Sequence, residues 1–281
     1  MRISGVFDSM LFFFFALQAQ AQAKQFGTIT SALSYHRLGL SIIAQHGKYV
    51  PKWEKENSIL FQNTGIRLVG ELNVSPSYIQ PGFRFIVQPI AIVKIQGYGF
   101  GHSYFGNFQT IVGYDSLDFN YGNNSVIAEY VENTQRQYSG FGTHVGGNIV
   151  LQAKIQDFVV LSSTDVSHWN IRRPSGEDGN GFFEREKEIM LQLEGDQILE
   201  NNSLVLYQID QKEDQFIRVG SFTTFRKAII SEDVLLRTGI LFSMQKNLHI
   251  SHILICQGYL QDRSYTDLWP SYIAYALKYS Y

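Results

Sequence analysis

One pair of residues has the types and the spacing for nucleophilic catalysis. His249 and Ser251 are separated by a single residue. Because side chains two positions apart lie on the same face of a β-strand, the imidazole could take the hydroxyl proton and activate the oxygen. Asp262 could orient the imidazole, although nothing in the sequence fixes it near His249. The alternative is that His249 and Ser251 are two polar residues at the end of a strand.

Other residue patterns predict no further chemistry. Asp115, Asp118 and Asn120 lack the spacing and the closing Glu of a calcium loop, and no group of His, Cys, Asp and Glu has metal-ligand spacing. We therefore expect no metal and no cofactor. The formal net charge is −2, from 23 basic and 25 acidic residues, which provides no basic surface for nucleic acid. The single cysteine, Cys256, excludes an intramolecular disulfide.

The elements that would position these residues are β-strands, as the last ten residues indicate. Large apolar or aromatic side chains occupy every second position there, and the positions between them are small or polar. This pattern resembles the closing strand of bacterial outer-membrane β-barrels, which the barrel assembly machinery reads as a signal ending in an aromatic residue. The resemblance implies a Gram-negative outer-membrane protein whose assembly signal consists of Tyr275, Leu277, Tyr279 and Tyr281.

Residues 1–23 have the pattern of a cleaved secretory signal peptide. Arg2 precedes an apolar core at residues 10–17, and small residues alternate with Gln at 19–23. The predicted organisation is therefore a signal peptide at 1–23 and one barrel domain at 24–281, exported to the bacterial outer membrane. No later apolar run is long enough for a transmembrane helix.

Alternation of apolar and polar residues recurs along the whole predicted mature chain. It predicts an all-β fold, a single antiparallel transmembrane barrel with twelve strands, or ten as the alternative. A soluble antiparallel sandwich would show the same alternation. This interpretation also places the long segment 102–137 on the periplasmic side, which conflicts with the short periplasmic turns of such barrels. The expected strands are 28–45, 59–74, 79–88, 90–101, 138–154, 157–170, 182–194, 202–210, 215–227, 233–245, 248–261 and 270–281.

The polar positions of these strands should face the lumen of the barrel. Both signs of charge occur among them, so the side chains could pair across a narrow lumen and fill it, or line a water-filled pore and set its selectivity. The expected lumen-lining residues are Arg67, Glu71, Arg84, Lys94, Lys154, Glu188, Arg218, Arg237 and Lys278.

These observations predict a non-enzymatic barrel that acts as a small diffusion channel or as a closed structural or binding barrel. Its expected surroundings are outer-membrane lipid and lipopolysaccharide, and aromatic residues in 102–137 could recognise a sugar or a partner, or fold inward to cap the barrel. The alternative function is lipid hydrolysis by His249 and Ser251. Outer-membrane phospholipases and lipid A deacylases carry a similar His-x-Ser pair, but the phospholipase Ser is followed by Asn and Gly, whereas His252 follows Ser251. The sequence leaves the oligomeric state open.

Overall fold

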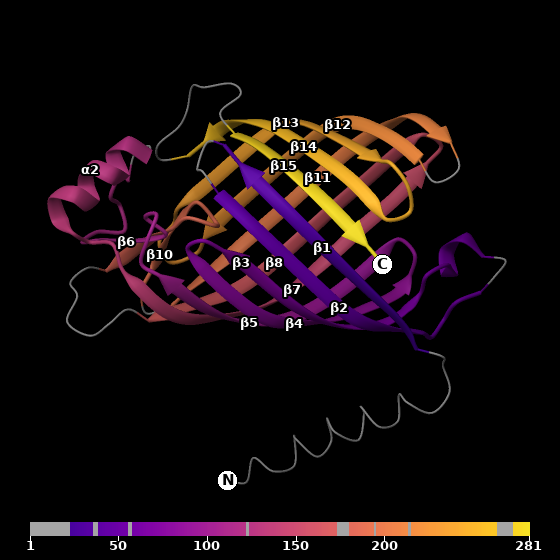
Figure 1. Cartoon of the computed structure of the whole chain (residues 1–281), viewed down its shortest axis with the longest axis horizontal. Helices are drawn as coiled ribbons and strands as arrows, with labels where there is room; N and C mark the ends of the chain where they lie inside the picture. The colour runs from indigo at the N-terminus through magenta and orange to yellow at the C-terminus, as the bar shows by residue number, and fades with distance from the viewer. Residues whose placement is uncertain are drawn as a thin grey trace, which may run out of the picture.

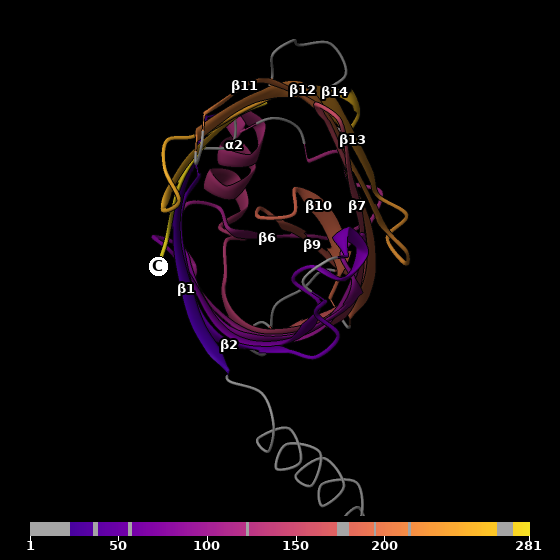
Figure 2. The ribbon, with the colours of Figure 1, turned by 90° about the vertical axis from the view of Figure 1, so that its right-hand side faces the viewer.

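The structure is a computed structural model that describes residues 23–35, 39–55, 58–121, 124–172, 180–193, 195–212, 215–262 and 272–281. Apart from Ala23, the expected signal peptide lies outside these residues. Twelve strands close into one antiparallel barrel, seen from the side in Figure 1 and along its axis in Figure 2. The predicted fold class and the strand number are confirmed. The barrel strands are β1 (Lys24–Ser34), β2 (Gly39–Pro51), β3 (Gly65–Ser75), β4 (Tyr78–Ile90), β5 (Val93–Phe105), β7 (Ser139–Ile155), β8 (Phe158–Arg172), β11 (Asp196–Lys212), β12 (Gln215–Ala228), β13 (Val234–Gln245), β14 (Ile250–Gln261) and β15 (Tyr272–Ser280).

Each strand turns alternate residues outward, as the sequence pattern requires. In β3, Leu68 and Leu72 are exposed on the outside, whereas Val69 and Glu71 between them are buried in the lumen. On β8 and β11 the outer face includes polar side chains, since Asn201 and Ser203 are hydrogen-bonded to Ser162 and Thr164. Elsewhere the outer surface is largely apolar, as on a barrel that faces lipid. Its exposed side chains include Ile29, Leu40, Ile42, Phe83, Phe85, Ile95, Val145, Ile149, Leu151, Val160, Val166, Val205, Ile240, Leu254, Tyr275, Leu277 and Tyr279.

The barrel closes where the first strand pairs with the last. β1 pairs with β15 from Thr28 opposite Ser280 to Ser34 opposite Ala274. The backbone of Tyr281 continues this ladder, because it exchanges two hydrogen bonds with Gly27, at 3.1 and 3.0 Å. A Cβ at Gly27 would lie only 2.2 Å from the Tyr281 ring, so the terminal tyrosine depends on a residue without a side chain opposite it. The start of β1 and the C-terminal Tyr281 therefore lie at one end of the barrel, here named the terminus end.

The opposite end carries a small folded unit, here named the cap. It contains a three-stranded antiparallel sheet of β6 (Ile111–Tyr114), β9 (Gly181–Glu184) and β10 (Ile189–Gln192), and the helix α2 (Asn124–Thr134). Figure 2 shows this sheet crossing the barrel when the molecule is viewed from the terminus end. A short 3-10 helix, η1 (Ile59–Phe61), lies in a connection at the terminus end. None of the helices in the described part of the chain has the length and apolarity needed to span a bilayer.

The predicted strand number is correct although two of the predicted strands are wrong. Segment 28–45 forms two barrel strands, β1 and β2, joined by residues 35–38, which contain no Gly, Pro, Asn or Asp to indicate a turn. Segment 182–194 alternates like a barrel strand but contributes β9 and β10 to the cap sheet. The extra strand at the start reverses the direction of the following strands, so segment 102–137 extends from the cap end and not from the terminus end. The sequence-based interpretation had placed this long segment on the same side as the chain termini, and that conflict with the short periplasmic turns therefore no longer arises.

Candidate functional site

The cap is a folded unit with apolar side chains on both faces of its sheet. One face packs onto the barrel wall in a buried cluster that contains Ile111, Phe182 and Ile189 from the cap and Tyr104 and Trp169 from the wall. The other face forms a second buried cluster with the rest of the cap. Its fully buried members are Val112, Tyr114, Tyr121, Ile127, Phe183 and Met190.

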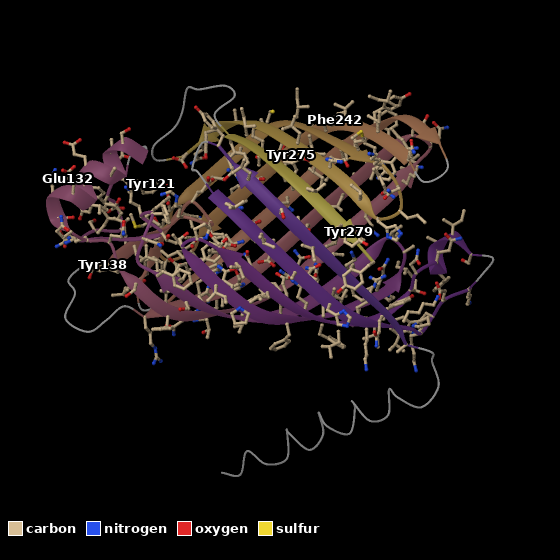
Figure 3. All side chains as sticks on the ribbon, viewed as in Figure 1. Tyr121, Glu132, Tyr138, Phe242, Tyr275 and Tyr279 are labelled. Atoms are coloured by element: carbon tan, nitrogen blue, oxygen red, sulfur yellow. The ribbon has the colours of Figure 1, made fainter. Side chains whose placement is uncertain are left out.

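The aromatic residues of segment 102–137 are partly buried in these clusters. Tyr104, Tyr114 and Tyr121 are buried, whereas Phe105 and Phe108 are exposed. Tyr104 packs in the cluster at the barrel wall, whereas Tyr114 and Tyr121 are buried in the second cluster, inside the cap. Figure 3 shows Tyr121 and Tyr138 at the cap end, close to α2. Burial of several large aromatic side chains gives the cap a substantial hydrophobic stabilisation of its own.

The turn between β9 and β10 carries four consecutive charged residues, 185–188, into the lumen. Lys187 Nζ lies 3.1 Å from Glu200 Oε2 on β11. Glu188 Oε2 lies 2.6 Å from Arg237 Nη1 on β13, and both of these side chains are only 5% exposed. Glu186 accepts a hydrogen bond from the Gln80 amide on β4. The turn is therefore attached to several strands around the barrel, and the residues 184–188 are here named the latch.

Two further contacts complete the attachment of the latch. The Tyr104 hydroxyl on β5 donates to Glu184 Oε1 at 3.2 Å, and the Tyr259 hydroxyl on β14 donates to Glu188 at 3.3 Å. Glu188 has a φ of 56°, a left-handed conformation that a residue other than Gly or Asn adopts only when its surroundings hold it there. The contacts of its carboxylate with Arg237 and Tyr259 provide that restraint.

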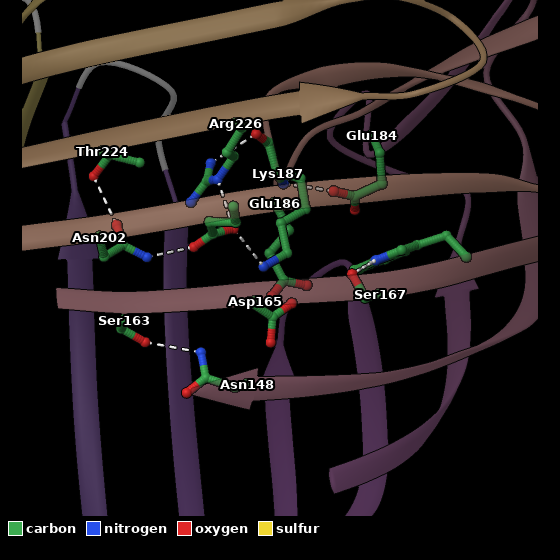
Figure 4. Close-up of polar contacts among 12 residues, drawn as sticks. Asn148, Ser163, Asp165, Ser167, Glu184, Glu186, Lys187, Asn202, Thr224 and Arg226 are labelled. Atoms are coloured by element: carbon green, nitrogen blue, oxygen red, sulfur yellow. Dashed lines mark hydrogen bonds and ion pairs between the residues drawn. The ribbon is translucent and has the colours of Figure 1, made fainter. Parts of the chain in front are cut away.

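Glu200 is the centre of a hydrogen-bond network with Lys187, Arg226 and Asn202. Figure 4 shows these three partners of Glu200 beside one another. Arg226 Nε contacts Glu200 at 2.8 Å, and Arg226 Nη1 donates to the Lys187 carbonyl at 2.7 Å. The Asn202 amide donates to the other oxygen of Glu200 at 2.6 Å. A buried carboxylate is tolerable only when its charge and its lone pairs are both satisfied. Here two cations and one amide satisfy them, and one of those cations belongs to the cap.

Glu184 is the residue of the latch whose proton affinity is most altered. Burial, together with the negative charge of Glu186, raises its pKa from 4.5 to about 8. The backbone N–H of Lys187 acts in the opposite direction, since it donates to Glu184 Oε2 at 2.6 Å. The carboxyl of Glu184 is therefore protonated at neutral pH, when it can serve both as a donor and as an acceptor within the cap.

A column of aromatic rings lies on the wall beside the cap. His144 stacks on Trp169 with the ring centroids 4.4 Å apart, and on Phe100 at 4.9 Å. A ring nitrogen of His144 contacts one of His102, and the other nitrogen of His102 lies 3.1 Å from the Tyr104 hydroxyl. The column is thereby connected to Glu184 through Tyr104. Among the described residues, no group of three or more His, Cys, Asp or Glu could hold a metal ion.

The expected lumen-lining residues lie at different positions along the barrel axis: near its middle, near the cap end, and in the half nearer the terminus end. Glu71 and Arg84 form an ion pair of 2.7 Å near the middle of β3 and β4. Arg237 lies near the cap end and pairs with Glu188 there. Glu188 is thus in the latch, and the expectation that a barrel strand carries it was wrong, because its segment folds as a hairpin inside the lumen.

Two arginines of the terminus half have polar partners that carry no charge. Arg67 donates to Gln88 at 3.0 Å, and Arg218 donates to Gln208 at 3.1 and 3.0 Å. Lys154 also contacts Gln208, at 3.5 Å, and has further interactions. Lys94 on β5 lies between two residues of the outer face, so its side chain is on the lumen side.

In the described part of the chain, no hydrogen bond joins the two residues that could form a hydrolase pair. His249 lies in the turn before β14, and its ring nitrogen is 2.7 Å from the carbonyl oxygen of Ser280. Ser251 lies on β14, and no hydrogen bond joins it to His249 in the described part of the chain. Asp262 follows β14 at the cap end, so the whole strand, about 40 Å long at 3.3 Å per residue, separates it from His249. The side-chain hydrogen bond of His249 in the described residues is thus to a backbone carbonyl and not to Ser251 or Asp262.

Several residues of the latch network escaped the sequence analysis. Lys187 and Glu200 were not identified, nor was the association of His102 with His144. One signal for the latch is present in the sequence: the charged run 185–188 stands between the apolar segments 182–183 and 189–191, as in a hairpin with buried strands.

Comparison with protein-family models finds no match, and neither does comparison with curated proteins. Solved structures do match. The β-domain of the Bordetella autotransporter BrkA is 8% identical, with 92% of this chain and 98% of that chain covered and a TM-score of 0.41. LpxR from Salmonella typhimurium is 10% identical, with coverage of 90% and 99% and a TM-score of 0.41. The translocator domain of the autotransporter NalP from Neisseria meningitidis is 9% identical, with coverage of 97% and 92% and a TM-score of 0.37. The similarity lies in the barrel fold.

Proposed function

We propose that this protein is an integral outer-membrane β-barrel without enzymatic activity, whose lumen is closed at the cap end. Of the two expected forms, a small diffusion channel and a closed binding barrel, the second is favoured. The observation that carries the proposal is the latch, whose residues contact strands β4, β5, β11, β13 and β14 from inside the barrel. A segment attached to so many strands obstructs the lumen in the resting protein.

The membrane location is supported by the outer surface of the barrel. Phe83, Leu151 and Ile240 point away from the lumen, and their side chains are 59%, 53% and 52% exposed. In water, so large an apolar surface would favour aggregation, whereas in a bilayer it is solvated by lipid. The lipid of the outer membrane, including lipopolysaccharide, is thus the partner we propose for this surface. The barrel assembly machinery would insert the chain, and β15 would be its recognition signal.

The orientation follows from the lengths of the connections. At the terminus end, residues 91–92, 156–157 and 246–249 connect their strands by short turns, and residues 52–64 form one longer connection that contains η1. The longest connection, residues 106–138, lies at the other end and forms much of the cap. Outer-membrane barrels have short periplasmic turns and long external loops. We infer that the cap faces the exterior and that the terminus end faces the periplasm.

The test is ion conductance in planar lipid bilayers. The wild-type protein should be silent, apart from rare openings. A variant in which residues 182–191 are replaced by a short Gly–Ser linker should give large, reproducible steps. A variant with Glu129→Ala and Glu132→Ala provides the control, because both side chains are exposed on α2 and the latch is left intact. Steady conductance of the wild-type protein, equal to that of the linker variant, would refute closure by the cap.

A further inference from the structure

The outer face of the barrel carries a group of polar side chains on the neighbouring strands β8, β11, β12 and β13. The pairing register places them beside one another, and one row crosses the strands with each member directly opposite the next: Ser162, Ser203, Thr223 and Thr238. Thr164 and Asn201 form a second directly opposed pair beside this row, and Ser221 lies on its other side. These residues are here named the polar patch.

The polar patch faces away from the lumen. Directly opposite residues of an antiparallel pair point to the same face of the sheet, so the whole row shares one direction. That direction is outward, because Val205 and Ile240, each two positions along a strand from the row, are exposed on the outside. Ser203 adjoins the middle residue of β11, and Ser221 is at the middle of β12. The patch is therefore at the middle height of the proposed membrane-spanning wall.

Hydrogen bonds join the side chains of the patch on β8 and β11. The Asn201 amide donates to Ser162 Oγ at 3.1 Å and to Thr164 Oγ1 at 2.8 Å. The Ser203 hydroxyl donates to Asn201 Oδ1 at 2.7 Å. The geometry thus fixes Asn201 as the centre of a polar network on a surface whose other residues are largely apolar.

The network leaves some of its own polar groups without partners. Thr164 acts only as an acceptor, and among the described residues its hydroxyl proton has no acceptor. Ser221 is exposed and forms no hydrogen bond within the described part of the chain. Lipid tails offer neither donors nor acceptors, so these groups are unfavourable in hydrocarbon. A protein surface with polar groups of its own would satisfy them.

A second copy of the chain fits the polar patch. Ser, Thr and Asn side chains both donate and accept hydrogen bonds, so the patch is complementary to itself, as a two-fold contact requires. It contains no charged residue, so two copies bring no like charges together. Small polar side chains also let two walls approach closely, as Ser and Thr do between transmembrane helices.

The wall that carries the patch is large enough for such a contact. Four strands spaced by about 4.8 Å, over an apolar height of about 25 Å, provide a flat area of about 480 Å² on each copy. Side-chain relief increases this area, so two copies together reach the total of about 1,000 Å² that a specific interface needs.

We propose that the polar patch is the contact surface between two copies of this chain in the membrane, related by a two-fold axis. Apolar residues beside the patch, such as Val166, Val205 and Ile240, form the rim of the contact. The inference rests on the membrane location proposed above, but it does not depend on closure of the lumen by the cap.

Sedimentation equilibrium of the purified protein, in detergent micelles matched in density to the solvent, tests the contact. The wild-type protein should sediment as a reversible dimer, and Ser203→Leu should weaken association by about tenfold or more. Ser31→Leu is the matched control, because Ser31 lies on the outer face of β1, directly opposite the exposed Leu277 and Ile42 and five strands away from β11.

A monomeric wild-type protein, or equal weakening by Ser203→Leu and Ser31→Leu, would overturn the proposal. Heat-modifiable migration in electrophoresis shows whether each variant folds. If Ser203→Leu does not fold, Asn201→Leu takes its place with the same expected result.

Disulfide cross-linking in isolated membranes tests whether the partner is a second copy. Residues near a two-fold axis meet their own copies. Ser203→Cys and Thr223→Cys, each combined with Cys256→Ser to remove the native thiol, should give an adduct of twice the protein mass when copper phenanthroline oxidises the two thiols to a disulfide. Ser31→Cys with Cys256→Ser should give none. An adduct of another mass would assign the patch to a different protein, and the absence of any adduct at both patch positions would refute the contact.

Failure of this inference and failure of the proposed function give different results. A protein that requires detergent for extraction but sediments as a monomer would refute the dimer and leave the membrane barrel intact. A protein released without detergent would refute the membrane location, and with it the reason for covering the patch. A dimer that conducts steadily would refute closure by the cap and leave the contact in place.

Discussion

The ion pair between Glu188 and Arg237 should control whether the cap stays in the barrel. Glu188→Gln preserves the size of the side chain but removes its charge, so Arg237 is left buried without a carboxylate. The structure makes this loss severe, because both side chains are 5% exposed and the Arg237 Nε already lacks a hydrogen-bond partner. Stacking of the guanidinium on the Tyr272 ring, at 3.9 Å, cannot replace the lost charge.

The magnitude follows from the burial of the pair. Removing one partner of a buried ion pair costs about 3–5 kcal/mol, chiefly because the other charge remains desolvated. If the barrel wall stays folded and only the latch is displaced, this energy is lost from the closed state alone. The ratio of closed to open molecules should then fall by about two to three and a half orders of magnitude, at about 1.4 kcal/mol for each factor of ten.

The double variant Glu188→Gln with Arg237→Gln separates the loss of the pair from general damage. Neutralising both partners removes the unpaired buried charge, so the double variant should be more often closed than Glu188→Gln alone. Open probability in planar bilayers measures this directly, and cleavage of the latch by trypsin at Arg185 or Lys187 provides an independent measure of displacement. If Glu188→Gln remains silent and resistant to trypsin, the ion pair does not hold the cap. If the double variant is as open as the single one, an unpaired charge is not the cause.

Four further results are expected. Arg84→Gln should lower the stability of the barrel by about 2–3 kcal/mol in chemical unfolding. It leaves Glu71, whose side chain is only 6% exposed, without its cation. An unchanged unfolding midpoint would contradict this expectation. Since burial raises the pKa of Glu184 above its value in the unfolded chain, the folded cap keeps a proton that the unfolded chain loses. Cap stability, measured by hydrogen exchange, should therefore be highest below the unfolded pKa of 4.5 and decline as pH rises to about 8, and Glu184→Gln should remove that decline. Tyr281→Ser should reduce the amount of heat-modifiable, folded barrel in the outer membrane. If the variant reaches the same amount of folded barrel as the wild-type protein, the proposed assembly signal is refuted. Ser251→Ala should leave the acyl profiles of phospholipid and lipid A unchanged, whereas an altered profile would revive the hydrolase alternative.

Much of the barrel could be predicted from the sequence because alternation is a local property. In the last strand, Tyr275, Leu277 and Tyr279 occupy every second position, and each is exposed on the outer face. The same rule failed for segment 182–194, since a hairpin with both faces buried also alternates. It failed again at residues 35–38, where no turn-forming residue separates β1 from β2. These two errors cancel in the strand number but not in the direction of the strands, which only the pairing order defines.

The candidate site was less predictable because its contacts join residues that are distant in sequence. The charge run 185–188 is visible in the sequence, but its partners lie on five strands of the wall. Glu188 and Arg237 are 49 residues apart, and Gln80 and Glu186 are 106 apart. No local pattern can specify such pairs, because they depend on where the closed barrel brings each strand.

By itself, the sequence determined the fold class, the inward or outward direction of most side chains and the apolar outer surface. These properties follow from the two-residue period of a strand, which acts between neighbours in the chain. The tertiary structure decided that a folded cap occupies one end of the lumen and that buried ion pairs attach it to the wall. Those properties arise from closure of the barrel, which brings wall strands that are distant in sequence around the latch.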